Sequence, residues 1–141
     1  PFFSFPETKI VGAVLESSFL IDILRNYRSA VSLLDELERK GESMFVAAPS
    51  VMELWEGALK SKVSEKEKAK VDELLASMNV LSLDSLSAKR AAEIEVELES
   101  KGAAIQAEDV MIAGIAATNA ETLVTNDAHY ARISGLRVLK Y

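Results

Sequence analysis

The sequence predicts a three-layer α/β/α domain with a central, mainly parallel sheet. Short apolar segments rich in β-branched residues alternate along the chain with longer segments of helical periodicity. Strands that alternate with helices are joined by crossovers, which make neighbouring strands parallel and cover both faces of the sheet. The 141 residues contain no internal repeat and no Gly/Ser-rich linker. We therefore expect a single domain over residues 9–141, preceded by an N-terminal extension of residues 1–8.

Composition limits the classes of function. Apolar residues make up 49% of the chain and charged residues 27%, which is typical of a globular protein. The chain has no cysteine, which excludes disulfides, zinc–thiolate sites and a thiol nucleophile, and which suits a cytoplasmic protein. The net charge of −6 excludes a broadly basic surface, so binding to nucleic acid would require local basic groups or carboxylate-held metal ions. No stretch reaches the roughly 18–20 apolar residues of a membrane span, so no membrane contact is expected.

The N-terminal part predicts a strand that leads directly into a helix. Residues 9–15 are apolar and partly β-branched, which is typical of a short buried strand. Ser17 or Ser18 is expected to cap a helix over residues 19–26, because serine side chains accept hydrogen bonds from free amides at helix starts. Glu16 therefore falls at a strand-to-helix junction that should be partly buried.

The next segments repeat the alternation. Residues 30–40 form an amphipathic pattern, and Gly41 is a natural stop because glycine readily adopts the left-handed conformation after a helix. Residues 44–47 predict a second strand, and a helix that begins at Pro49 and Ser50 is expected to continue to about residue 60.

Two further segments continue this order. Residues 64–78 predict a helix with a capping box formed by Ser64 and Glu67, and its charged residues are expected to face solvent. Residues 80–83 predict a third strand.

The C-terminal part predicts two helices and the last strands. Asp84 is expected to cap a long helix that ends before Gly102. The segment "AEDVMIAGIAATNA" is apolar nearly all round, so it predicts a buried helix in which Gly114 permits close approach to a neighbour. Strands are predicted over residues 122–125 and 137–139.

Four acidic residues fall where strands end, which is the edge at which ligands bind in open α/β sheets. Glu16 follows the first strand, and Glu53 is expected in the first turn of the helix after the second. Asp109 begins the buried helix, and Asp127 follows the fourth strand within "LVTNDAHY". If the sheet winds in the usual way, all four converge.

Each acid also has a structural interpretation. Glu53 stands three residues after Ser50, as in a capping box, and Asp109 at a helix start favours the helix dipole. Asp127 suits a turn or helix cap, and a salt bridge would satisfy Glu16. Clustered carboxylates repel one another unless they are protonated or bind cations. Oxygen ligands suit Mg²⁺ or Mn²⁺, which bind phosphates and promote phosphodiester hydrolysis, and this chemistry does not require the single histidine, His129.

Several motifs together resemble the PIN-domain family. "VLESSFLIDIL" resembles its opening motif, "APSVMELWEGA" its second, and "IQAEDVMIAGIAATNAETLVTNDAHYARISGLRVLKY" its closing third. The resemblance covers nearly all of residues 9–141 in order, and it is greatest to the VapC-type toxins of VapBC toxin–antitoxin pairs. It implies a metal-dependent endoribonuclease that uses Mg²⁺ or Mn²⁺ to cleave RNA. It also implies a homodimer and a small antitoxin that inserts near the acidic site.

The resemblance implies an acidic catalytic and metal-binding cluster of Glu16, Glu53, Asp109 and Asp127. Ser18 and Thr125 match hydroxyl positions that support this cluster by hydrogen bonds. One residue departs from the family pattern, because the first acid is normally aspartate. The extra methylene of glutamate moves the carboxylate by up to about 1.5 Å.

Other functions remain as alternatives. A catalytically weakened or inactive PIN module would bind protein or RNA without cleaving it. A phosphatase of the haloacid-dehalogenase type fits less well, because it requires two aspartates where this chain has Glu16 and Ser18. A response-regulator receiver would use Asp84 as its phosphoacceptor, but a helix cap explains this residue more simply.

Overall fold

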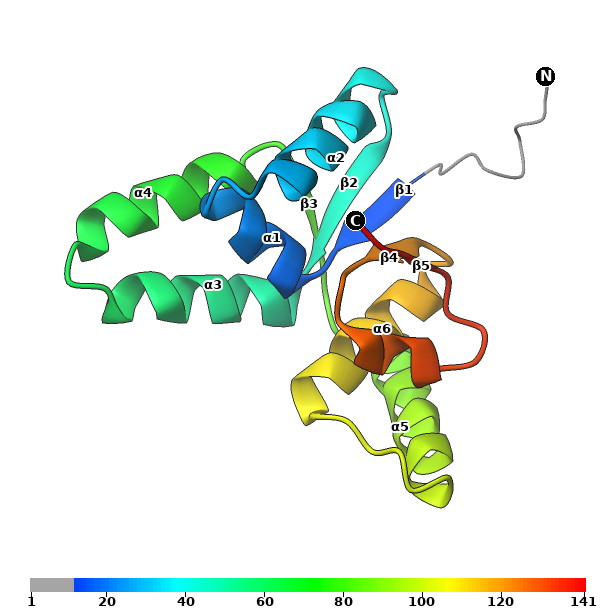
Figure 1. Cartoon of the computed structure of the whole chain (residues 1–141). Coiled ribbons are helices and arrows are strands. Elements are labelled where there is room, and N and C mark those ends of the chain that lie inside the picture. The colour runs from blue at the N-terminus through cyan, green and yellow to red at the C-terminus, as the bar shows by residue number, and fades with distance from the viewer. Residues whose placement is uncertain (1–11) are drawn as a thin grey trace, which may run out of the picture.

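The computed structural model describes residues 12–141, which form a parallel sheet between two helical layers (Figure 1). The strands described are β1 (Gly12–Leu15), β2 (Ser43–Ala47), β3 (Asn79–Leu81), β4 (Thr122–Val124) and β5 (Val138–Leu139). The helices described are α1 (Ser17–Leu24), α2 (Arg28–Arg39), α3 (Ala48–Lys60), α4 (Ser64–Leu75), α5 (Ser85–Ser100), α6 (Ala107–Thr118) and the short 3-10 helix η2 (Ala128–Arg132). The predicted N-terminal extension and the first residues of the predicted first strand lie outside the described residues.

The sheet confirms the predicted three-layer fold. Its strand order is β3-β2-β1-β4-β5, and every neighbouring pair is parallel. Leu15, the last residue of β1, is in register with Val124, the last residue of β4. The segments that follow these two strands therefore begin side by side at one edge of the sheet.

The core is divided by the sheet into two apolar clusters. Ala13 and Leu15 contribute to the cluster that α1, α2, α3 and α4 cover, whereas Val14 contributes to the cluster that α5, α6 and η2 cover. Alternate residues of a strand point to opposite faces, so the continuous apolar sequence of β1 is explained by burial on both sides. Figure 1 shows these two groups of helices on either side of the sheet.

The α5–α6 contact depends on a glycine. A Cβ atom on Gly114 would lie 2.7 Å from the Ser87 carbonyl oxygen and 2.8 Å from the Ala91 Cβ. Small residues at this contact let the two helices approach closely, as the sequence predicted. The predicted stops are also confirmed, since Gly41 and Gly102 follow α2 and α5 with φ angles of 70° and 66°.

Several predicted helix starts were wrong. Glu16, and neither Ser17 nor Ser18, occupies the N-cap position of α1. Both serines bond elsewhere, because the Ser17 hydroxyl donates to the Ser50 hydroxyl at 2.8 Å and the Ser18 hydroxyl donates to the Glu16 carboxylate. Ser50 therefore forms no capping box with Glu53, and α3 begins one residue before the predicted Pro49, at Ala48.

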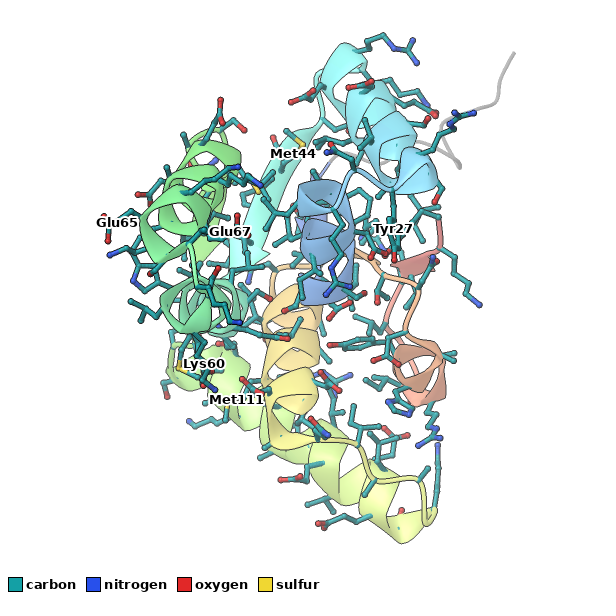
Figure 2. The ribbon with its side chains drawn as sticks, turned by 60° about the vertical axis from the view of Figure 1, so that its left-hand side comes forward. Tyr27, Met44, Lys60, Glu65, Glu67 and Met111 are labelled. Carbon is teal, nitrogen blue, oxygen red and sulfur yellow. The ribbon has the colours of Figure 1, made fainter. Side chains whose placement is uncertain are left out.

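The helix α4 also begins without the predicted capping box. Val63 is its N-cap residue, and Ser64 is already its first helical residue. Glu65 is exposed and lies on the outer side of α4 in Figure 2, as predicted, whereas Glu67 is half-buried and lies toward α1 and α3. Asp84 caps α5 as predicted, since its carboxylate accepts a hydrogen bond from the Ser87 amide at 2.9 Å. None of the helices within residues 12–141 has the length and apolar character needed to cross a membrane.

Candidate functional site

Glu16 is buried at the junction between β1 and α1, where its side chain is 4% exposed. The hydroxyls of Ser18 and Thr125 both donate to its Oε1 atom, at 2.5 Å and 2.6 Å. Ser18 lies in the first turn of α1, and Thr125 directly follows β4. The start of α1 places the Ser18 hydroxyl at this carboxylate oxygen, and the register of β1 with β4 brings the Thr125 hydroxyl to the same atom.

No lysine, arginine or histidine within residues 12–141 forms an ion pair with Glu16, so the predicted salt bridge is absent from this part of the chain. Burial raises the pKa of Glu16, and the hydrogen bonds from Ser18 and Thr125 oppose this rise in pKa. The nearby carboxylate of Asp109 raises the pKa of Glu16 further. An added cation would relieve this cost of ionisation.

Asp109 lies in the first turn of α6, on the opposite helical layer from α1. The Tyr130 hydroxyl donates to its Oδ1 atom at 3.1 Å, and the Tyr130 ring is fully buried. Partial burial raises the pKa of Asp109, the bond from Tyr130 lowers it, and the charge of Asp127 raises it. The start of α6 thus positions an acid whose negative charge is only partly stabilised by the protein.

Asp127 is the N-cap of η2 and sits directly beside Thr125 in the same loop. Its backbone amide donates to the Thr125 hydroxyl at 3.0 Å, so Thr125 links Glu16 to this loop. The Asp127 Oδ1 atom accepts a bond from the His129 amide at 2.9 Å and lies 3.3 Å from the His129 Nδ1. The predicted cap role of Asp127 is therefore confirmed, and it leaves the other carboxylate oxygen free of recorded protein donors within residues 12–141.

Asp109, Asp127 and His129 form one potential metal-binding group, because each offers a ligand atom within 4.8 Å of the others. Two carboxylates and one imidazole are suitable ligands for a divalent metal ion. Sequence reasoning missed His129, because the 3-10 turn that brings it beside Asp127 was not predicted. The signal available was its position two residues after an aspartate that can accept its amide.

Glu53 lies outside this group of three. It is in the second turn of α3, not the first turn as predicted, because the helix begins at Ala48. It lines a hollow of about 240 Å³ between α1, α3 and α4. The residues around this hollow are Ile21, Leu24, Arg25, Glu53, Leu54, Gly57, Ala58, Glu67 and Val71.

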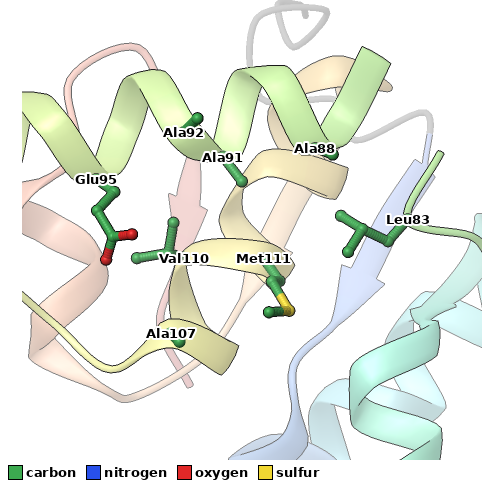
Figure 3. Close-up of a pocket in the computed structure, with 8 residues that line it drawn as sticks. All are labelled: Leu83, Ala88, Ala91, Ala92, Glu95, Ala107, Val110 and Met111. Carbon is green, nitrogen blue, oxygen red and sulfur yellow. The ribbon is translucent and has the colours of Figure 1, made fainter. Parts of the chain in front are cut away.

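A second hollow, of about 220 Å³, lies between α5, α6 and the residues before α5 (Figure 3). Leu83, Met111 and Glu95 are among its lining residues, and most of the others are alanines. None of the four candidate acids lines it. The edge of the sheet that carries the candidate acids, called the acidic edge below, is therefore distinct from this mostly apolar hollow.

Tyr141 connects two of the segments that carry the candidate acids. Its hydroxyl donates to Asp22 on α1 at 2.5 Å, and its ring packs against Phe19 with centroids 4.8 Å apart. Its backbone amide donates to the Asn126 side chain at 2.9 Å, one residue before Asp127. Asp22 thus has a structural role, and the loop after β4 is held against α1.

Comparison with known proteins identifies the family. The chain is 28% identical over 125 residues to the tRNA(fMet)-specific endonuclease VapC of Shigella flexneri, covering 88% of this chain and 93% of that protein. It is 34% identical over 96 residues to the protein of the same name from Salmonella typhimurium, covering 67% and 73%. It also resembles the crystal structure of VapBC2 from Rickettsia felis bound to a promoter DNA fragment, with a TM-score of 0.84, 27% identity, and coverage of 92% and 98%. Residues 13–136 match the PIN domain, and the chain therefore belongs to the PIN-domain family.

Proposed function

We propose that this chain is a metal-dependent endoribonuclease that hydrolyses RNA phosphodiester bonds as the toxin of a toxin–antitoxin pair. The observation that carries this proposal is the network in which Thr125 links buried Glu16 to the loop of Asp127, while Asp109 lies close to Asp127. The relatives from Shigella flexneri and Salmonella typhimurium, which are named as endonucleases, support this choice over other metal-dependent chemistry.

Glu16, Asp109 and Asp127 are the proposed principal ligands of Mg²⁺ or Mn²⁺, and Glu53 is a proposed ligand directly or through water. Such an ion, when bound, orients water and stabilises the charge that develops on a phosphodiester group. Ser18 and Thr125 orient Glu16 by holding Oε1, which leaves Oε2 without a side-chain donor among the described residues. These hydroxyls compensate for burial without supplying a positive charge, so Glu16 keeps its attraction for a cation.

The proposed partners are RNA as substrate and a small antitoxin protein as inhibitor. The VapBC2 complex of Rickettsia felis supports an antitoxin partner. The hollow beside Glu53 combines apolar side chains with Arg25 and Glu67, which suits a peptide segment of mixed character. A homodimer and a cytoplasmic location are further predictions for this chain.

The test is RNA cleavage by the purified chain with and without Mg²⁺ or Mn²⁺. Asp109→Asn is the informative variant, because an asparagine oxygen can still accept the Tyr130 hydroxyl while the charge is removed. We expect metal-dependent cleavage by the wild-type protein and background cleavage by the variant, with unchanged thermal unfolding. Glu108→Gln, which changes the neighbouring acid, is the matched control and should still cleave.

Two results would contradict the proposal. Binding of RNA without cleavage at any metal concentration would favour a non-catalytic PIN module. Hydrolysis of phosphomonoesters with intact RNA would favour a phosphatase.

A further inference from the structure

The acidic edge contains a nitrogen donor that the proposed carboxylate chemistry leaves without a role. His129 lies on η2, and its imidazole belongs to the group of three ligand atoms that lie within 4.8 Å of one another. The other two members are Asp109 and Asp127, which come from α6 and from the loop after β4. His129 is thus placed among acids from two separate elements.

Contacts on both sides of His129 hold its backbone within the short helix η2. The His129 amide donates to Asp127 Oδ1 at 2.9 Å, which closes the turn and brings the ring beside the same carboxylate. The next residue, Tyr130, is fully buried and its hydroxyl donates to Asp109. These two bonds fix the backbone of His129, so its imidazole starts from a position beside Asp109 and Asp127.

Packing does not explain the location of His129. Its side chain is 49% exposed, so it contributes little to the core. Its 3.3 Å contact with Asp127 is a partly exposed pair, and such pairs contribute little to stability. The ring is open to solvent and to any ion that approaches Asp109 and Asp127.

We propose that His129 is a further protein ligand of the catalytic ion, beside the carboxylates, and shifts the preference of the site from Mg²⁺ towards Mn²⁺. This inference rests on the proposed function, because it concerns the same ion. Mg²⁺ is bound almost entirely by oxygen, whereas imidazole is a common ligand of transition-metal ions. A nitrogen beside two carboxylates therefore adds more to the binding of Mn²⁺ than to that of Mg²⁺.

Pulsed electron paramagnetic resonance of the Mn²⁺-loaded full chain tests this proposal directly. The chain contains one histidine, so a nitrogen coupling of imidazole type can arise only from His129 when the protein carries no histidine tag. We expect this coupling in the wild-type protein and its loss in His129→Gln and His129→Asn. A bound Mn²⁺ without the coupling would overturn the proposal and leave the carboxylate site intact.

Metal affinity, measured by calorimetry, provides the second test. We expect His129→Gln to weaken Mn²⁺ binding on the order of 10-fold, which is typical when groups that support a metal site are removed. Mg²⁺ binding should change far less. Ala131→Gln, on the same turn but outside the group of three, is the matched control and should bind both ions as the wild-type protein does.

The outcomes separate this inference from the proposed function. Equal weakening of Mg²⁺ and Mn²⁺ binding in His129→Gln would overturn the metal preference, although RNA cleavage could still be metal-dependent. Absence of Mn²⁺ binding to the wild-type chain would overturn this inference, and absence of binding of both Mn²⁺ and Mg²⁺ would overturn the proposed function as well.

Discussion

Glu16 and Asp109 both have raised pKa values, but their surroundings differ. Glu16 is almost fully buried and is held by the hydroxyls of Ser18 and Thr125. Asp109 is only partly buried, accepts one bond from Tyr130, and shares its surroundings with Asp127 and His129. The first acid is therefore fixed by the protein, whereas the second faces a region that an ion can enter.

This difference indicates a division of roles at the acidic edge. Neutral donors fix Glu16 without neutralising it, so its orientation is set before any ion binds. Asp109 and Asp127 lie close to the exposed side chain of His129, so a ligand bound to these two acids can exchange with solvent. The following predictions test whether the two acids depend on their surroundings in these different ways.

The largest expected effect is that of Thr125→Val. This substitution keeps the side-chain shape but removes the donor to Glu16 and the acceptor of the Asp127 amide. We expect a loss of about 3 kcal/mol in the free energy of unfolding, because the buried Glu16 carboxylate and the partly buried Asp127 amide each lose a partner. Urea denaturation at neutral pH measures this loss in the free energy of unfolding. Thr125→Ser, which keeps the hydroxyl, should lose much less, and equal losses in both variants would contradict the role given to the hydroxyl.

The next effect is a change in the pH dependence of stability in Glu16→Gln. Burial raises the pKa of Glu16 in the folded state above its ordinary value of 4.5, so the folded protein binds this proton more tightly than the unfolded chain does. The contribution of Glu16 to stability is therefore greatest below pH 4.5 and is lost as the pH rises through the folded-state pKa. Glutamine keeps an oxygen that accepts both hydroxyls but does not titrate.

We thus expect the stability of the wild-type protein to fall relative to Glu16→Gln as the pH rises from 4.5. Urea denaturation at a series of pH values, in the presence of a chelator, measures this difference. Glu53→Gln is the control for removal of an acid outside the hydroxyl network. Parallel pH profiles for wild type and Glu16→Gln would contradict the assigned environment.

A smaller effect is expected for Tyr130→Phe, which tests the Asp109 side of the comparison. The ring remains buried, but Asp109 loses its donor, so we expect a loss of about 1 kcal/mol in the free energy of unfolding. The pKa of Asp109 should rise further, because the bond from Tyr130 lowers it. Carboxyl resonances in NMR titration measure this change. The exposed Tyr27→Phe is the control, and an unchanged Asp109 titration would contradict the bond.

The smallest effect is expected for Tyr141→Phe. The variant keeps the contact with Phe19 and the backbone bond to Asn126, and it loses only the bond to Asp22. We expect about 0.5 kcal/mol of destabilisation and little change in metal affinity. Thermal unfolding and calorimetry measure these quantities. A loss as large as that of Thr125→Val would show that Tyr141, rather than Thr125, is the main link between α1 and the loop after β4.

The sequence predicted the elements better than the contacts between them. Alternating apolar and amphipathic segments are local signals, so the strands and the buried helix α6 could be predicted. The cap roles predicted for Ser17, Ser50 and Ser64 were wrong, and for Ser17 and Ser50 the reason is that each serine bonds to the other. The Ser17–Ser50 bond joins residues 33 positions apart, and no local pattern indicates it.

The candidate site was predicted only in part. Thr125 connects Glu16 to the loop of Asp127, as the predicted strand order suggested. Asp109 and Asp127 belong to one group of potential metal ligands. Glu53 was misplaced by part of a helical turn, because Ala48 rather than Pro49 begins α3. His129 was given no role, because its position depends on a 3-10 turn whose stability comes from Asp127 and from Tyr130 in the core.

The acidic edge draws on both helical layers, since Glu16 precedes α1 on one face of the sheet and Asp109 belongs to α6 on the other. An ion held by both would add a cross-link between the two layers, which also meet where α3 contacts α6. Metal binding should then slow the exchange of amide hydrogens with deuterium in both α1 and α6, although the two helices belong to separate apolar clusters. Binding of one ion at this site would therefore stabilise both apolar clusters of the core.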